Sequence, residues 1–201
     1  MTSETARLPK RLACAMIAAM AALAVAAGAC GGGGGDSATT LQTAAPVTNY
    51  PYPVQRFDEV QPGHQHLAAG QTFDGYNSNP PTSGPHAPAP VPWGISDVAI
   101  AKETAVHNME HAGVVVWYNC NAGPARLTAD QCAKLRSDLA AVVQPLLADG
   151  RKVVMTPYSG MDHRVALTAW QYLDAFDDFD ATRVKTFIET FECHTDVEHF
   201  C

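Results

Sequence analysis

Two histidines and a glutamate stand at a spacing that could hold a metal ion, in the string His107-Asn-Met-Glu110-His111. On a helix, residues i and i+4 share one face, so both imidazoles could bind one ion with Glu110 beside them. Glu110 could instead be the general base of a zinc peptidase, with Glu189 or Glu192 as a distant third ligand. A third interpretation makes the histidines hydrogen-bonded core residues.

Two upstream strings contain further histidines. Gly63-His-Gln-His66 has an HxH spacing, which places both imidazoles on one face of an extended chain. The string PPTSGPH, from Pro80 to His86, ends in a histidine on a backbone that prolines make rigid. A rigid backbone suits a preorganised ligand, although the same string could form a tight surface turn.

PPTSGPH, followed about twenty residues later by VHNMEHAGVVVWYN (Val106 to Asn119), resembles the domain of unknown function 3105 family. Its members are bacterial, exported or membrane-anchored proteins of unestablished activity, and the resemblance covers roughly residues 55–192. Where the family usually has EHGG, this chain has EHAG, so Ala112 replaces a glycine. The resemblance implies no reaction, but it implies a grouping of His66, His86, His107, Glu110 and His111.

We expect this grouping to bind a transition metal, because imidazole ligands suit copper or zinc. Thioethers from Met109 and Met161 would favour Cu(I), although Met109 on a helix could equally belong to the core. Three classes of function stay open. They are metal binding, a metal-dependent hydrolase that uses Glu110, and a non-catalytic structural or interaction module of the cell envelope.

The first 29 residues are typical of an export signal. Three basic residues precede Leu12–Ala27, an apolar run of 16 residues that is shorter than the ~20 needed to span a membrane. Small residues then precede Cys30, as in the lipobox of bacterial lipoproteins, where the cysteine is acylated after cleavage. We therefore expect a signal peptide at 1–29 and a lipid (palmitate) anchor on Cys30, at the outer face of the bacterial cell membrane. The alternatives are a secretory signal cleaved near Ala29 and an uncleaved anchor.

The charge of the chain excludes nucleic acid as a partner. The net charge is −7, and loss of residues 1–29, which carry a net charge of +2, leaves −9. Binding to phosphates requires a basic face, which is not expected on so acidic a protein.

Composition divides the exported part into two regions. Residues 30–55 are rich in Gly, Ala and Thr and are expected to form a tether, and residues 56–201 form a single domain. Residues 56–100 contain seven prolines, which predicts a half-domain built from loops.

Regular elements are expected after residue 100. The pattern predicts helices over 101–111, from the capping box at Thr128 to residue 149, and after Asp180. Pro145 should kink or end the second helix. Strands are expected over 114–119, 152–156 and 164–170, giving an α+β fold with a small mixed sheet covered by helices.

Four cysteines of the domain permit three disulfide pairings. Short connecting loops favour Cys120–Cys132 and Cys193–Cys201, and an oxidising compartment favours disulfides over thiols. The alternative for the second pair is a metal site that includes His194 and His199.

Overall fold

The structure, a computed structural model, describes residue 47 and residues 49–201. The signal peptide expected at 1–29, the acylation site at Cys30 and most of the expected tether lie outside the described residues. Tyr50, which belongs to the expected tether, is buried and packs edge-on against Phe187 and Phe191. Its hydroxyl group donates to Asp174. This end of the segment therefore lies against the domain.

A six-stranded mixed sheet forms the centre of the fold, in the order β1-β6-β5-β3-β4-β2. Strand β3 (Val114–Tyr118) pairs in parallel with β4 (Val153–Pro157), and β4 in parallel with β2 (Gly94–Ile95). The antiparallel side of the sheet consists of β5 (Val165–Ala169), β6 (Tyr172–Phe176) and β1 (Gln55–Arg56). The expected α+β class with a small mixed sheet is confirmed.

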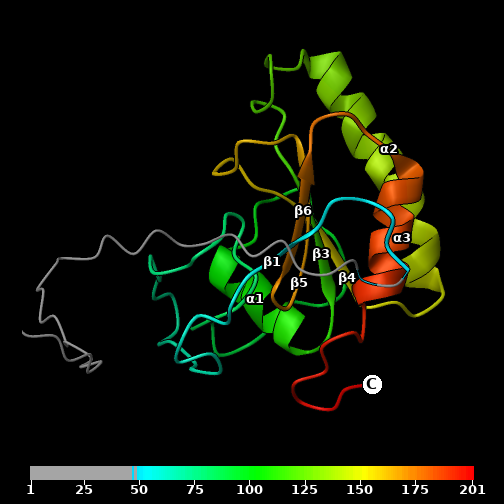
Figure 1. The fold of residues 1–201 in the computed structure, drawn as a ribbon. Helices are drawn as coiled ribbons and strands as arrows, with labels where there is room; N and C mark the ends of the chain where they lie inside the picture. Colours follow the sequence, from blue (N-terminus) through cyan, green and yellow to red (C-terminus); the bar gives the residue numbers. More distant parts are fainter. Residues whose placement is uncertain (1–46, 48) are drawn as a thin grey trace, which may run out of the picture. The chain divides into compact units, whose positions relative to one another are not determined.

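Helices cover both faces of this sheet (Figure 1). Helices α2 (Ala129–Ala148) and α3 (Ala181–Phe191) share one core with Val114, Val116 and Tyr118 of β3. Helix α1 (Lys102–Glu110) shares the other core with Val115 and Trp117. Because β3 is buried on both faces, it needs the continuous apolar run VVVWY rather than alternation with polar residues.

The expected helix starts are confirmed. Thr128 forms a capping box with Gln131, and the Asp180 carboxylate accepts the backbone N–H of Arg183. Helix α2 does not end at Pro145 but continues to its C-cap at Asp149. Pro145 lies in the last turn, so little helix follows it, and the adjacent Leu146 is buried in the core.

The sequence patterns missed strand β6. It follows β5 through a tight turn in which Gln171 adopts φ +69°, a left-handed conformation that glycine usually occupies. Without a glycine there, the sequence contains no hairpin signal. Strands β1 and β2, of two residues each, are too short to produce a pattern.

Two disulfides, Cys120–Cys132 and Cys193–Cys201, have the pairing expected from the sequence. The alternative metal site that used Cys193 and Cys201 is wrong, because disulfide sulfurs are not thiolate ligands. Among the residues described, no helix combines the length and apolar character needed to cross a membrane.

Candidate metal centre

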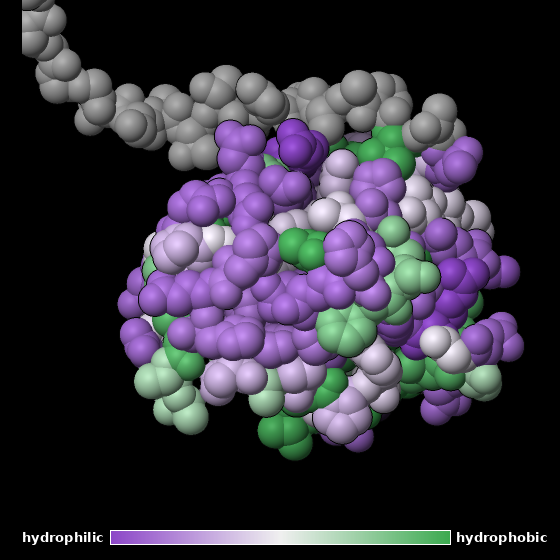
Figure 2. Space-filling view, turned by 90° about the horizontal axis from the view of Figure 1, so that it is seen from below, coloured by the Kyte–Doolittle hydropathy of each residue, from purple (hydrophilic) through white to green (hydrophobic). Residues whose placement is uncertain are grey.

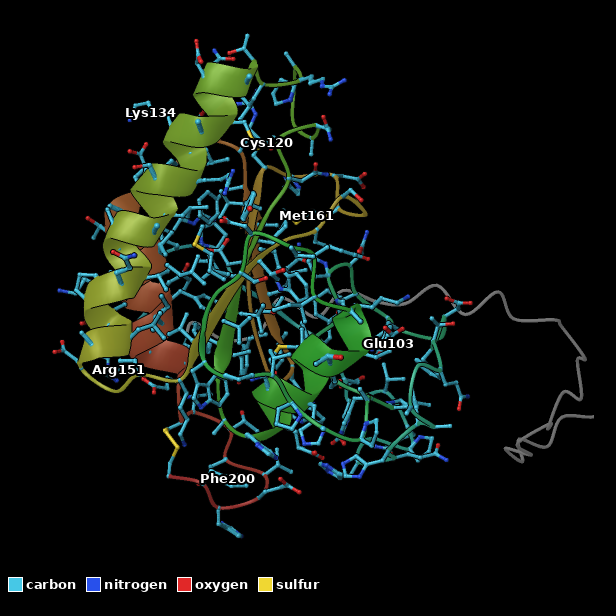
Figure 3. The ribbon with its side chains drawn as sticks, turned by 180° about the vertical axis from the view of Figure 1, so that it is seen from behind. Glu103, Cys120, Lys134, Arg151, Met161 and Phe200 are labelled. Carbon is cyan, nitrogen blue, oxygen red and sulfur yellow. A yellow bond between two sulfur atoms is a disulfide. The ribbon has the colours of Figure 1, made fainter. Side chains whose placement is uncertain are left out.

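Helix α1 buries polar side chains on the side that faces the proline-rich residues 56–100. The Glu103 carboxylate accepts the backbone N–H of Phe73 at 3.0 Å. The Asn108 amide bonds both the N–H and the C=O of Val91, at 3.0 and 2.9 Å. Figure 3 labels Glu103 on this helix. These contacts hold the loop-built half of the domain against α1.

The string PPTSGPH is buried throughout, so the alternative of a surface turn is wrong. The Ser83 hydroxyl accepts the N–H of Val60 at 3.2 Å, and the carbonyl of Thr82 accepts the N–H of Gln171 at 3.0 Å. Gly84 has φ +118°, and a Cβ atom there would lie 2.9 Å from the Cβ of Val60. Glycine at this position therefore allows the loop backbone to approach the side chain of Val60 closely.

A short parallel bridge joins the two upstream histidine strings, His66 to His86. The carbonyl of His86 accepts the N–H of Leu67 at 2.7 Å, and the N–H of His86 donates to Gln65 at 3.0 Å. The two imidazole rings then lie 5.0 Å apart, above the face of α1 that carries His107.

Four of the expected ligands converge. One ligand atom from each lies within 4.8 Å of all the others, in a group formed by His66, His86, His107 and Glu110. Tetrahedral zinc with bonds near 2.05 Å needs ligand atoms about 3.4 Å apart, so this spacing is close to a coordination sphere. We call this group the four-residue cluster. His66 is half-exposed, whereas the other three side chains are buried.

Backbone carbonyls determine which imidazole nitrogen is free. Nδ1 of His86 donates to the carbonyl of Gly84 at 2.8 Å, and Nδ1 of His107 donates to that of Ala87 at 2.6 Å. A carbonyl only accepts hydrogen bonds, so both Nδ1 atoms carry a proton, and in a neutral ring the lone pair then lies on Nε2. Such hydrogen bonds from the second nitrogen are typical of metal-binding histidines.

The free Nε2 of His86 lies 2.8 Å from Oε2 of Glu110. Both atoms are buried, and neither has a hydrogen-bond partner among the described residues. Two acceptor atoms facing each other in a buried place are unfavourable unless a proton or a metal ion binds to both of them. The donor set and its orphaned atoms therefore fit a cation.

Burial favours the neutral form of His107, in α1, and of His111, the C-cap residue of this helix. Burial lowers the pKa of His107, and burial together with the neighbouring His107 lowers the pKa of His111. The neutral imidazole is the form that binds metal.

His111 stands beside the four-residue cluster rather than inside it. Its Nε2 lies 3.1 Å from Nε2 of His107, and it forms a second group with Glu110 and Glu198. Sequence reasoning did not single out Glu198, because a glutamate in a C-terminal loop carries no spacing signal that relates it to α1.

The structure also gives a role to His64, the other half of the HxH pair. Its Nδ1 donates to Oε1 of Glu110 at 2.7 Å, and its ring stacks on Trp170 at 5.5 Å. Its Nε2 lies 3.2 Å from Oε1 of Glu59. Both histidines of the HxH string, His64 and His66, therefore face the carboxylate of Glu110, although the family resemblance pointed only to His66.

Other residues considered as ligands lie elsewhere. Met109 and Met161 are buried in the hydrophobic cluster between α1 and the sheet. Glu192 accepts hydrogen bonds from Arg151 and from the backbone of Lys152, and Glu189 pairs with Lys185.

A family model described as "Protein of unknown function (DUF3105)" matches residues 66–199. The chain belongs to this family. The residues that match the DUF3105 family model include the whole four-residue cluster together with His111 and Glu198. Comparisons with curated proteins and with solved structures find no match.

Proposed function

We propose that this DUF3105 protein is an extracytoplasmic lipoprotein domain that binds a zinc or copper ion through the four-residue cluster. The observation that carries the proposal is the convergence of three imidazoles and one carboxylate, two of the imidazoles having Nε2 freed by backbone carbonyls. Nitrogen and oxygen ligands favour Zn²⁺ or Cu²⁺ over Cu⁺, which prefers sulfur. The two disulfides support a location outside the reducing cytoplasm.

The hydrolase alternative needs Glu110 as a free base. Its Oε1 instead accepts a hydrogen bond from His64, and its Oε2 faces His86 and His66 at 2.8 and 3.9 Å. This arrangement supports Glu110 as a ligand. The structural-module alternative is supported by the contacts between α1 and the proline-rich half, and the presence or absence of bound metal distinguishes it from our proposal.

Metal binding is tested on the purified full chain in detergent, by titration with Zn²⁺ and Cu²⁺ after chelator treatment. His66→Ala removes a ligand that is half-exposed, so the fold should survive. We expect affinity for the tighter-binding ion to fall by at least about 100-fold, because loss of a hydrogen-bond partner to a ligand already costs about 10–100-fold.

His163→Ala is the matched control. This side chain is 50% exposed, against 49% for His66, and it faces Asp177 instead of the cluster. Its affinity should equal that of the wild-type protein. Equal affinity in His66→Ala and wild type, or no stoichiometric metal in the wild type, would overturn the proposal.

A further inference from the structure

The C-terminal loop, residues 192–201, is a built structure at the end of α1. The Cys193–Cys201 disulfide closes it. The Asp196 carboxylate accepts the N–H groups of Phe200 and Cys201 at 2.7 and 2.9 Å. Figure 3 shows this loop, with Phe200 labelled, beyond the end of α1 that is farther from Glu103.

This loop brings a carboxylate to a histidine that the four-residue cluster leaves out. Oε2 of Glu198 lies 3.0 Å from Nε2 of His111, and the Phe200 ring packs 4.1 Å from the His111 ring. Ligand atoms of Glu110, His111 and Glu198 all lie within 4.8 Å of one another. Figure 2 views the molecule from the side on which the C-terminal loop lies in Figure 1, and the face seen there is mainly hydrophilic. The side chains of His111 and Glu198 are 21% and 41% exposed, so ions in water can reach this group.

We propose that Glu110, His111 and Glu198 hold a second divalent cation, so that the centre is dinuclear and Glu110 bridges its two ions. This inference rests on the proposed function, because the bridge requires an ion in the four-residue cluster. Glu110 belongs to both groups, and its carboxylate has about four lone-pair sites, so it can bind neighbouring ions while Oε1 still accepts the hydrogen bond from His64. Paired ions in proteins lie about 3.5–4 Å apart.

The positions of His107 and His111 agree with such a pair. Their Nε2 atoms are 3.1 Å apart, yet each belongs to a different group of ligands, so the two groups are adjacent. Glu110 and Glu198 bring two negative charges to the pair of cations. One imidazole and two carboxylates form a donor set that suits Zn²⁺.

The test counts zinc ions bound by the full chain, using calorimetric titration and metal analysis of the same samples. We expect two Zn²⁺ in the wild type and one in Glu198→Gln, which keeps the size of the side chain but loses its charge. Glu189→Gln, on an exposed glutamate of α3 that pairs with Lys185, is the control and should bind two. Cobalt gives a second readout, since two bridged Co²⁺ ions couple their spins and a single ion does not.

The outcomes separate the two proposals. One ion in the wild type, or two in Glu198→Gln, would overturn the second site and leave the first intact, with Glu198 then only an ion-pair partner of His111. No bound zinc would overturn both.

The role of the disulfide that closes the C-terminal loop can be tested by the same zinc titration. Because the disulfide restricts the loop that carries Glu198, Cys193→Ser/Cys201→Ser should weaken the second Zn²⁺ about tenfold and spare the first. Cys120→Ser/Cys132→Ser opens a disulfide between β3 and α2 and should preserve both affinities. Equal weakening in both double variants would contradict a role of the loop.

Discussion

Proton positions decide what the histidines can do. The carbonyls of Gly84 and Ala87 fix a proton on Nδ1 of His86 and of His107, so in the neutral rings Nε2 is the atom that can bind. Nε2 of His86 has no partner among the described residues, whereas Nε2 of His107 faces Nε2 of His111. Oε2 of Glu110 then faces Nε2 of His86 at 2.8 Å, and neither atom has a hydrogen-bond partner among the described residues. An imidazole that is only a core residue would have no reason to leave that nitrogen without a partner.

The lowered pKa values of His107 and His111 predict how stability depends on pH in the metal-free protein. The unfolded chain binds protons on these groups below pH 6.5, whereas the folded chain does so only at lower pH. The free energy of unfolding should therefore be level above pH 6.5 and fall below it, by at most about 1.4 kcal/mol per pH unit for each proton.

Urea unfolding between pH 7.5 and 5.5 measures this slope. His111→Gln removes one of the two groups and should give a shallower slope than the wild type, whereas His163→Ala, at a histidine outside the site, should not. A slope in His111→Gln equal to that of the wild type would contradict the assignment.

At the scale of elements, α1 is the part that organises the centre. One side of it packs Ala105, Val106 and Met109 against the sheet, and its other side binds the proline-rich half through polar groups. The last turn of α1 and its C-cap residue bring His107, Glu110 and His111 to the site, so the conformation of this helix end sets the positions of these side chains. Ala112, directly after the helix, has φ +63°, the left-handed conformation typical of a helix stop.

Substitution of Ala112 tests this helix end. A β-branched residue tolerates left-handed backbone poorly and this position is buried, so Ala112→Val should lower the free energy of unfolding by about 2 kcal/mol or more. Ala112→Gly, the residue usual in the family, should stay within about 1 kcal/mol of the wild type. Its relief of strain is offset by the lost methyl group and by added freedom in the unfolded chain. Denaturant titration of both variants measures the effects, and a Val variant as stable as wild type would refute the argument.

At the scale of the whole molecule, a layered domain places its candidate centre away from the two-helix layer. Helices α2 and α3 cover one face of the sheet, while α1 and the proline-rich half cover the other (Figure 1). The candidate centre lies on the α1 side, where residues from positions 64 to 198 meet. Two disulfides close loops at β3 and after α3.

The proposed anchor belongs to this scale too, and Cys30 tests it. If Cys30 is acylated, the wild-type chain made in a bacterial host should lie in the membrane fraction, and Cys30→Ser should lose the lipid. Mass spectrometry of the N-terminus and fractionation measure both effects. Cys14→Ser, inside the expected signal peptide, is the control and should not change the mature protein. Membrane retention of an uncleaved Cys30→Ser chain would favour the uncleaved anchor instead.

Local patterns in the sequence determined the three helices, strands β3, β4 and β5, and much of the candidate site. The capping box at Thr128, the apolar run of β3 and the i, i+4 spacing of His107 and His111 each act between residues that are close along the chain. The same is true of the disulfide pairings, which close short loops. Resemblance to a family added His66 and His86, which no local rule connects to α1.

Only the tertiary structure decided how the candidate ligands divide between two groups. It placed His111 with Glu198 rather than in the four-residue cluster, it brought His64 to Glu110, and it buried the PPTSGPH loop. Each of these depends on segments that are distant in sequence, and packing between such segments leaves no periodicity to read. The proton positions on His86 and His107 have the same origin, because the carbonyls that fix them are placed by the folding of the loop against α1.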